Sequence, residues 1–316
     1  MLEVKNLTAG IKSEKKILKA VKDISFTIAK GEVVGLAGES GCGKSTTALA
    51  ITNLLPYGFN ILYGDILFDK KSLIGKNTKN TGIIFQDSIQ ALNPLMRVGR
   101  QIIENLEQKT ENREQKKENK EKVIDILIEL GFKEPDKIFE AFPHQLSGGM
   151  CQRIMTAIAA ISNPHLIIAD EPSSSLDEES QKCVLSFLMK MNRENKTSIL
   201  IISHDLSIIR QYCSRIMIMY AGKIIEEGKT ELLSSPRHPY TRALINAVPS
   251  INKRGKKLET ISGKVPSIND EFSGCSFVSR CSKAQSICFN NIPAKQKQDD
   301  NHSVWCHFPA EGCDYE

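Results

Sequence analysis

Short apolar runs alternate with amphipathic stretches along this chain of 316 residues. The first thirty residues alternate apolar and polar side chains, which predicts two strands. Residues 33–38 (VVGLAG) form an apolar run that ends in glycine, and they predict a buried strand. A glycine-rich turn follows, and residues 45–55 predict a helix. Two further strand-like runs occupy residues 61–68 and 81–85.

Residues 107–130 begin as an almost wholly charged tract and become apolar from Val123 onward. Val123, Ile124, Ile126 and Leu127 provide an apolar stripe in the second half of this segment. The pattern predicts a surface helix that docks by its C-terminal half. A low-complexity linker is the alternative interpretation.

A second alternation of strands and helices follows. Strands are expected at 165–172, at 197–205 and as a hairpin-like pair at 215–228, and helices at 178–195 and 205–213. This rhythm predicts an α/β fold with a largely parallel sheet that helices cover on both faces. It stops after about Pro236, and the rest is richer in Pro, Gly, Ser and Cys, which indicates a small appended domain.

Composition excludes some classes of function. Hydrophobic residues make up 41% and charged residues 25% of the chain, which is typical of a soluble globular protein. The net charge of +5 is mild, and basic residues are interleaved with acidic ones, so nucleic acid is not an expected partner. There is no run of 18 apolar residues and no signal-peptide pattern at the N-terminus. We therefore expect the chain to stay in the cytoplasm, where its nine cysteines would not form disulfides.

The turn at residues 38–45 (GESGCGKS) fits the phosphate-loop pattern G-x-x-x-x-G-K-[ST], and it lies between a predicted strand and a predicted helix. Glycines let backbone N–H groups turn toward phosphates, and the helix N-terminus adds partial positive charge. Lys44 would reach the β- and γ-phosphates, and the Ser45 hydroxyl would ligate Mg²⁺. A chance glycine turn is the alternative, which the strand and helix on either side disfavour. The predicted nucleotide-binding residues are Gly38, Glu39, Ser40, Gly41, Cys42, Gly43, Lys44, Ser45 and Thr46.

Asp170 and Glu171 end the apolar run Leu166–Ala169. A carboxylate at the C-terminal end of such a strand faces the crevice where α/β proteins bind ligands. Asp170 suits the water shell of Mg²⁺, and Glu171 suits a general base that orients the attacking water. The alternative is that the two acids cap the helix that follows.

One more motif decides the class. Residues 146–153 (LSGGMCQR) resemble the LSGGQ-type signature of ABC ATPases. The chain order also matches that family: phosphate loop, Gln86 in IIFQD, signature, IIADEP, Ser175-Leu176-Asp177 and His204 in ISHD. The resemblance implies a P-loop ABC ATPase cassette, with a mixed sheet, helices on both sides and a helical subdomain that carries the signature.

The family mechanism implies a role for each matching residue. Two cassettes pair head to tail, so Ser147, Gly148 and Gly149 would donate hydrogen bonds to the γ-phosphate bound on the partner. Gln86 would sense Mg²⁺ and the attacking water and relay the nucleotide state to the permease. His204 would contact the γ-phosphate and hold Glu171 in place, and Asp177 would bridge the subunits. Ser45, Gln86 and Asp170 would surround the Mg²⁺.

The chain departs from the family pattern at two places. Ile11 stands where the family usually has an aromatic residue that stacks on adenine. Cys42 lies in the phosphate loop at a predicted helix N-terminus, where thiol pKa values tend to be lowered, so it is a candidate site of oxidative inhibition.

The C-terminal third indicates which type of membrane transporter this ATPase would serve. Residues 236–244 (PRHPYTRAL) contain P-x-H-P-Y-T-x-x-L, which resembles the hallmark of oligopeptide and dipeptide importer ATPases. Close relatives of these ATPases drive the import of nickel. The resemblance implies peptide import, with a nickel complex as the alternative cargo. It also implies peripheral attachment to the cytoplasmic face of the membrane. The implied partners are a second, non-identical ATPase, two transmembrane permease subunits and, indirectly, an extracytoplasmic solute-binding protein.

Two rival classes are weaker. ABC ATPases of DNA repair and translation normally carry a coiled-coil insertion, a second cassette or a basic arm, and none occurs in this sequence. A nucleotide-binding regulator without turnover is disfavoured by the presence of both Glu171 and His204. We expect a cassette at residues 1–235, with its helical subdomain at about 90–162, and a cysteine-containing domain at 236–316.

Four cysteines of this last domain have the spacing C-x5-C-x6-C-x17-C: Cys275, Cys281, Cys288 and Cys306. Four thiolates in a short, loop-rich segment can hold a [4Fe–4S] cluster or a structural zinc ion. Zinc sites favour closely spaced pairs, which this tail lacks, and some members of the resembled subfamily carry the cluster, so we expect the cluster first and zinc second. Buried free thiols without metal are the third interpretation. Cys313 is left over.

Overall fold

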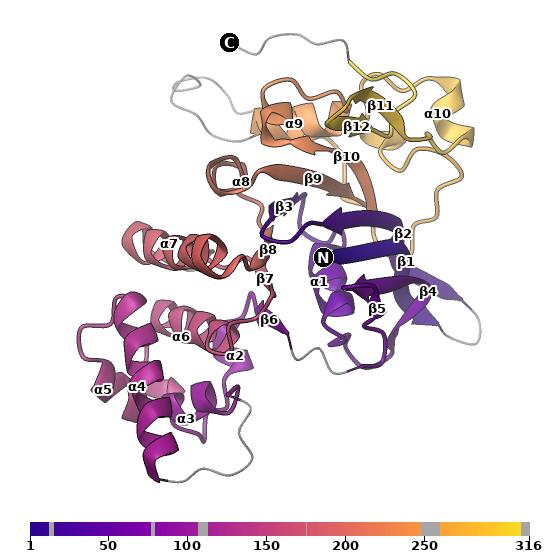
Figure 1. The fold of residues 1–316 in the computed structure, drawn as a ribbon. Coiled ribbons are helices and arrows are strands. Elements are labelled where there is room, and N and C mark those ends of the chain that lie inside the picture. The colour runs from indigo at the N-terminus through magenta and orange to yellow at the C-terminus, as the bar shows by residue number, and fades with distance from the viewer. Residues whose placement is uncertain (13–15, 77–79, 107–112, 175, 248–259, 311–316) are drawn as a thin grey trace. The chain divides into compact units, whose positions relative to one another are not determined.

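The computed structural model describes residues 1–12, 16–76, 80–106, 113–174, 176–247 and 260–310 (Figure 1). The chain forms two compact units. The first unit is assembled from Met1–Thr27, Val34–Lys76 and Ser203–Glu316, and the second from Ile28–Val33 and Asn77–Ile202. Both ends of the chain therefore belong to the first unit.

The N-terminal strands form a sheet of their own in the first unit. Its order is β2-β1-β4-β5, with β1 at Leu2–Lys12, β2 at Ile17–Ile28, β4 at Phe59–Phe68 and β5 at Lys71–Ser72. β1 pairs with β4 in the antiparallel sense. The expected strands are confirmed, and a largely parallel sheet is expected only for the strands that alternate with helices later in the chain. The alternation of apolar and polar side chains in the N-terminal strands suits an antiparallel sheet with one buried face.

A second group of strands in the first unit carries the phosphate loop. β3 at Val33–Ala37 lies parallel to β9 at Arg215–Tyr220, and β9 pairs with β10 at Lys223–Lys229 as an antiparallel hairpin. Every residue of β3 is buried, as its apolar run predicts. The helices of this part are α1 at Lys44–Ile51 and α8 at Leu206–Tyr212.

The C-terminal segment extends this sheet. β12 at His302–Val304 pairs with β10, and β11 at Gln296–Asp299 pairs with β12, so the order is β11-β12-β10-β9-β3. Helices α9 at Pro239–Ala247 and α10 at Ser286–Asn290, drawn in orange and yellow, lie near β11 and β12 (Figure 1). Short 3-10 turns occupy Thr230–Leu233 and Val278–Arg280. The domain boundary expected at residue 236 stays a prediction.

The second unit contains the parallel strands β6 at Thr81–Ile84, β7 at Leu166–Asp170 and β8 at Ser198–Ile202, in the order β8-β7-β6. All residues of β7 and β8 are buried, as expected for apolar runs inside an α/β layer. The long helix α7 at Glu178–Asn195 connects these two strands, and such a crossover lets them run parallel.

A group of helices fills the rest of the second unit. They are α2 at Ser88–Ala91, α3 at Val98–Ile103, α4 at Arg113–Glu129, α5 at Pro135–Glu140, the 3-10 turn at Pro143–Gln145 and α6 at Gly148–Ala160. In α4 the side chains of Asn119, Val123 and Leu127 share one buried face. The predicted docking helix is thus confirmed from residue 113 onward, where the linker alternative is wrong, and residues 107–112 lie outside the described residues.

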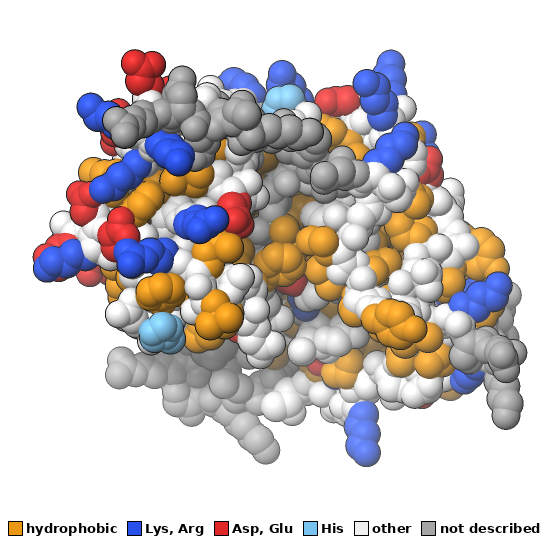
Figure 2. All heavy atoms as spheres, turned by 90° about the horizontal axis from the view of Figure 1, so that it is seen from below, with side chains coloured by type: hydrophobic (Ala, Val, Ile, Leu, Met, Phe, Trp, Pro, Cys, Tyr) orange, Lys and Arg blue, Asp and Glu red, His pale blue; other side chains and the backbone are white. Residues whose placement is uncertain are grey.

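The outward face of α4 is charged. Lys122 pairs with Glu118 at 2.7 Å, one turn away. Figure 2 shows basic and acidic side chains interleaved on the side of the view where these helices lie. Among the described residues, no helix combines the length and the apolar character that crossing a membrane requires.

Candidate functional site

The phosphate loop runs from the end of β3 to the start of α1, as the motif predicts. Gly38, Gly41 and Gly43 have φ angles of +153°, +79° and +109°, a region that favours glycine. A side chain at Gly43 would also collide with the backbone, because its Cβ would lie 2.7 Å from the carbonyl oxygen of Ala20. The sequence therefore has glycine where the backbone must turn.

Lys44 is held inside this loop. Its side chain is buried, with 7% of the residue exposed, and its ammonium donates to the carbonyl oxygens of Gly38 at 2.7 Å and Glu39 at 3.0 Å. Ser45 and Thr46 follow in the first turn of α1 and are half-buried. The loop thus places a fixed cation and a hydroxyl beside the backbone amides that begin α1, which is the chemistry of a phosphate and Mg²⁺ site.

The expectation for Cys42 is wrong. Burial raises the pKa of this thiol, and the nearby Lys44 ammonium, 3.8 Å from its sulfur, offsets that only in part. The side chain is almost fully buried because it packs inside the loop, near Gly38. A buried thiol with a raised pKa is a poor nucleophile, so Cys42 does not have the properties of an oxidation-sensitive cysteine.

Two residues that the sequence analysis did not connect with the loop contact it. The hydroxyl of Tyr240 accepts a hydrogen bond from the backbone N–H of Glu39 at 2.8 Å. The guanidinium of Arg280 donates to the Glu39 carboxylate at 2.7 and 3.0 Å. Both residues belong to the first unit but lie far along the chain from the loop, so no local pattern could have indicated these contacts.

Asp170 and Glu171 lie at the C-terminal end of β7 in the second unit, as predicted. Both are buried, and Glu171 has a φ of +51°, which is uncommon for a residue with a side chain. Its N–H donates to the carbonyl of Ile202 at 2.9 Å, which fixes this conformation. The alternative role as helix caps is wrong, because Asp177 caps α7 by accepting from the N–H of Ser180 at 2.9 Å.

Gln86 follows β6, the neighbour of β7, so it belongs to the same edge of the second unit as the two acids. Its side chain is exposed. Gln152 of the signature helix α6 donates to the carbonyl of Phe85 at 3.4 Å, next to Gln86. The signature helix is thereby bonded directly to the segment that carries Gln86.

The signature turn lies at the start of α6, as expected. Ser147 is exposed and caps the helix, with its hydroxyl accepting from the N–H of Met150 at 3.3 Å. Gly148 and Gly149 form the first residues of the helix. The turn therefore presents a helix N-terminus next to an exposed hydroxyl.

His204 and Asp177 are also exposed. His204 belongs to the first unit with Lys44 and Ser45, whereas Gln86, Asp170, Glu171, the signature residues and Asp177 belong to the second. The hydrogen bonds from Ser180 lower the pKa of Asp177, which keeps the cap ionised. Ser175 of the same motif lies outside the described residues.

Four cysteines of the C-terminal segment line one small cavity in the first unit, with about 10 Å³ of free space. They are Cys275, Cys281, Cys288 and Cys306, the four that the spacing selects. The eight cysteines that the structure describes are free thiols, and Cys313 lies outside the described part. Burial, followed by the neighbouring thiols, raises the pKa of Cys306 to about 11.

The same cavity is lined by His238, whose ring is fully buried. Its Nδ1 atom accepts from the N–H of Tyr240 at 3.0 Å, so the proton of the neutral ring is on Nε2, and this atom has no hydrogen-bond partner in the part of the chain that the structure describes. Sulfur donors and an unsatisfied N–H thus surround one space. Among the described residues, however, no group of three or more His, Cys, Asp or Glu is arranged to hold a metal ion. The predicted cluster therefore stays a proposal.

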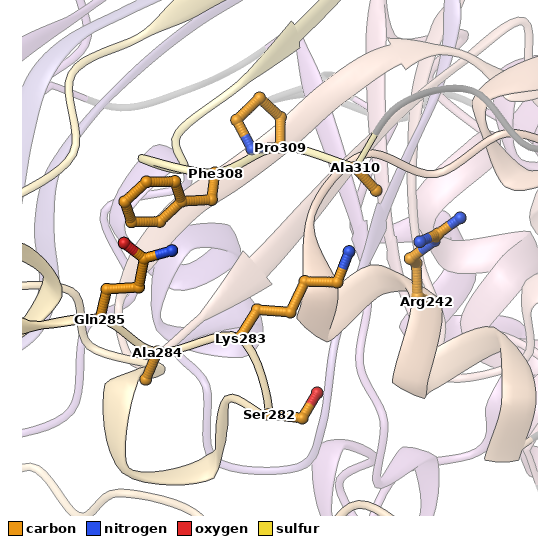
Figure 3. A pocket seen from close by; sticks show the side chains of 8 residues that line it. All are labelled: Arg242, Ser282, Lys283, Ala284, Gln285, Phe308, Pro309 and Ala310. Atoms are coloured by element: carbon orange, nitrogen blue, oxygen red, sulfur yellow. The ribbon is translucent and has the colours of Figure 1, made fainter.

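A more open pocket of about 570 Å³ lies beside this cavity in the C-terminal segment. Figure 3 shows Lys283 extending along it between Gln285 and Arg242. Its lining contains none of the predicted nucleotide-binding residues, so it is not the nucleotide site.

Comparison with known proteins decides the family. Residues 21–174 match the ABC transporter family, and residues 225–288 match the C-terminal region of oligopeptide/dipeptide transporters. The dipeptide transport ATP-binding protein DppD of Haemophilus influenzae is 36% identical, over 98% of this chain and 96% of its own length. The chain belongs to the ABC transporter family. It is an ABC-type ATPase of the oligopeptide/dipeptide group.

Other relatives agree with this assignment. The oligopeptide transport ATP-binding protein OppD of Bacillus subtilis is 37% identical, over 96% of this chain and 87% of its own length. Among solved structures, the dimeric ATP-binding cassette MJ0796 bound to ADP and Pi matches 73% of this chain and 99% of its own, with 27% identity and a TM-score of 0.64. The expected cassette fold is thus confirmed.

Proposed function

We propose that this ABC ATPase hydrolyses ATP to drive the import of peptides across a cell membrane. The observation that carries the proposal is that similarity to dipeptide and oligopeptide transport ATP-binding proteins extends over nearly the whole chain, including the C-terminal region. The relatives reported above are named for peptides, which favours peptides over a nickel complex as cargo.

The chemistry follows from the residues at the two candidate sites. Lys44 and the amides at the start of α1 would bind the β- and γ-phosphates, and Ser45, Gln86 and Asp170 are the residues that would hold Mg²⁺. The metal supplies charge neutralisation when it is bound. Glu171 accepts the proton of the attacking water, and the fixed backbone around it supports this role because it limits where the carboxylate can lie.

The signature residues act on the nucleotide of a partner. The exposed position of Ser147 at a helix N-terminus supports this assignment, because an anion can reach it from outside the chain. His204 orients Glu171 and contacts the γ-phosphate, and Asp177 bridges the two cassettes. The match to a dimeric cassette supports a paired assembly.

The partners of the chain are a second, non-identical ATPase and two permease subunits, with a solute-binding protein outside the membrane. The chain is bound at the cytoplasmic face. These assignments rest on membership of the peptide-transport group. Gln86 and the segment after it relay the nucleotide state to the permease.

Reconstitution tests the proposal. The full importer in vesicles should hydrolyse ATP faster when its binding protein is loaded with a dipeptide or a short oligopeptide than when it is empty. Nickel–histidine in place of peptide is the matched control. Stimulation by the nickel complex alone would reassign the cargo, and ATP turnover that no permease affects would remove the transport function.

We further propose that Cys275, Cys281, Cys288 and Cys306 hold a [4Fe–4S] cluster, with a zinc ion as the alternative. The donor set supports this assignment, because the four thiols line one cavity. When bound, the metal would crosslink a segment that has few large apolar side chains. ATP hydrolysis needs no redox step, so the role of the metal is to hold this segment together.

Anaerobic purification followed by iron, sulfide and zinc analysis and a visible spectrum tests the metal. Iron and sulfide in equal amounts with a broad visible absorption would support the cluster, and one zinc per chain would support the alternative. Cys281→Ser should lose the metal, whereas Cys213→Ser, which changes a buried thiol outside the cavity, should keep it. A colourless, metal-free protein with a folded C-terminal segment would contradict both.

A further inference from the structure

Glu39 of the phosphate loop is held from outside the loop by a paired hydrogen bond. Both terminal nitrogens of Arg280 donate to its two carboxylate oxygens, at 2.7 and 3.0 Å. Only 3% of the Arg280 side chain and 20% of the Glu39 side chain are exposed. A two-point ion pair that water hardly reaches is geometrically strict and strong compared with a surface pair.

Arg280 is itself fixed on its other sides. Its Nε donates to the carbonyl of Ser262 at 2.8 Å, and one terminal nitrogen also donates to the hydroxyl of Tyr220 at 3.3 Å. The guanidinium lies 5.7 Å from the ring centre of Tyr220 and 6.0 Å from that of Phe277. Because these contacts determine where the guanidinium lies, they also determine where the Glu39 carboxylate lies.

Tyr240 fixes the backbone of the same residue. Its hydroxyl accepts from the N–H of Glu39, and its own N–H donates to the ring of His238. The carboxylate of Glu226 accepts from the backbone N–H groups of Arg237 and His238, at 2.6 and 3.0 Å, and contacts the ring of His302 at 2.7 Å. The HPYT motif is therefore part of a bonded chain that leads from β12 and β10 to the phosphate loop.

An aromatic cluster joins these supports to the thiol cavity. The ring of Phe277 lies edge-on to Tyr220 at 5.2 Å and packs against Tyr240 at 5.4 Å, measured between ring centres. Phe277 and Arg280 both lie between Cys275 and Cys281 in the chain. Any movement of this short segment moves Arg280.

The pair matters because Glu39 brings a negative charge into a loop that binds a polyanion. An unpaired Glu39 carboxylate would repel the phosphates. If the residue moved, its backbone carbonyl oxygen could no longer hold the Lys44 ammonium in the same place. We propose that Arg280, together with Tyr240, is a positioning residue for ATP binding, which neutralises Glu39 and keeps its carboxylate away from the phosphates. The inference rests on the proposed role of the loop in binding ATP.

Arg280 does not touch the nucleotide in this proposal, so its loss should affect affinity more than turnover. The affinity of the purified full chain for a fluorescent ATP analogue should fall on the order of tenfold in Arg280→Ala, within the usual range of coupling between sites. The kcat of the reconstituted importer at saturating ATP should change much less than KM. Arg280→Lys keeps the charge without the paired geometry, so its affinity should lie between wild type and Arg280→Ala.

A double variant separates positioning from simple damage to the fold. Glu39→Gln/Arg280→Ala removes the repelling charge along with its partner, so it should bind ATP more tightly than Arg280→Ala alone. Lys295→Ala is the control, because it removes a C-terminal ion pair, with Glu227 at 2.6 Å, that does not involve the loop. Its affinity should equal that of wild type.

Three outcomes have distinct meanings. Unchanged affinity in Arg280→Ala, or a double variant no tighter than Arg280→Ala, would overturn the positioning role. Lys44→Ala should abolish binding, and if it does not, the proposed role of the loop fails instead. If Arg280→Ala does not fold, Arg280→Lys carries the test, and wild-type affinity in that variant would overturn the positioning role.

Discussion

Two glycine-rich turns of this molecule each lead into a helix, residues 38–43 into α1 and residues 147–149 into α6. The first is enclosed: Lys44 is buried, and Tyr240 and Arg280 fix Glu39 from outside. The second is open, with Ser147 exposed and its hydroxyl used as a helix cap. The comparison teaches that burial distinguishes the two turns: the first is closed off by residues of its own chain, whereas the second is open in the way that the proposed action on a partner's nucleotide requires.

The largest expected effect is a loss of ATP hydrolysis without a loss of ATP binding, from a substitution that leaves both turns unchanged. Glu171→Gln keeps the shape of the side chain but cannot accept a proton, so ATPase activity should fall by about 10²–10⁴-fold. ATP binding should survive, and the variant should accumulate as a nucleotide-bound dimer in size-exclusion chromatography. Near-normal turnover would remove Glu171 from the role of base.

A change in the open turn should slow hydrolysis of the ATP bound to the partner, without weakening ATP binding at the enclosed turn. Ser147→Arg places a bulky cation at the start of α6 and should reduce turnover on the order of 10²-fold, the usual cost of losing an oriented donor. Binding of a fluorescent ATP analogue by the isolated chain should not change. His144→Arg, which adds the same charge to a nearby exposed residue, is the control. Turnover by a monomer at a rate independent of protein concentration would contradict action in trans.

Mild acid should loosen the enclosed turn first. Burial lowers the pKa of His238 from 6.5 to about 4, so the unfolded chain binds this proton more readily than the folded one. The contribution of neutral His238 to the free energy of unfolding is therefore fully present above about pH 6.5. It is lost as the pH falls toward 4, by about 3 kcal/mol in all. Hydrogen exchange at pH 7 and pH 5, corrected for intrinsic rates, should show protection decreasing at residues 38–43 more than at 147–149. Equal changes at both turns would contradict the dependence on His238.

The smallest expected effect is on the free energy of unfolding, when one methyl group is added to a glycine of each turn. Gly43→Ala should destabilise the chain by about 1–3 kcal/mol, because φ is +109° and the new Cβ would lie 2.7 Å from a backbone oxygen. Gly149→Ala meets only the side-chain carbon of Leu176 at 3.2 Å, inside a helix where alanine is favoured, so its effect should lie within about 1 kcal/mol. Urea unfolding measures both. A larger loss in Gly149→Ala would reverse the comparison.

Local pattern explains what the sequence could predict. The phosphate loop, the acidic end of β7, the signature helix and the docking face of α4 each depend on residues close together in the chain, and all were found where expected. The contacts of Tyr240 and Arg280 with Glu39 span 201 and 241 residues, so no periodicity could reveal them. The thiol of Cys42 was misjudged because a helix N-terminus is visible in a sequence, whereas burial is not.

The spacing of the four cysteines lies between these cases. It selected the residues that line one cavity, because a metal-binding pattern is local. It could not predict that His238 would line the same cavity, with no hydrogen-bond partner for its Nε2 among the described residues, because His238 belongs to a different segment of the chain.

The pairing of β12 with β10 has a consequence for the order of synthesis and folding. The second unit is almost continuous in the chain and can fold as soon as residue 202 has left the ribosome. The first unit is built from both ends of the chain, and its sheet is completed only when His302–Val304 arrives. At roughly 5–20 residues per second, the ribosome needs on the order of ten seconds to make this remainder. Throughout that time β10 lacks its edge partner β12, and the phosphate loop lacks at least its contact with Arg280, which exposes an unpaired sheet edge to chaperones and proteases in every newly made copy.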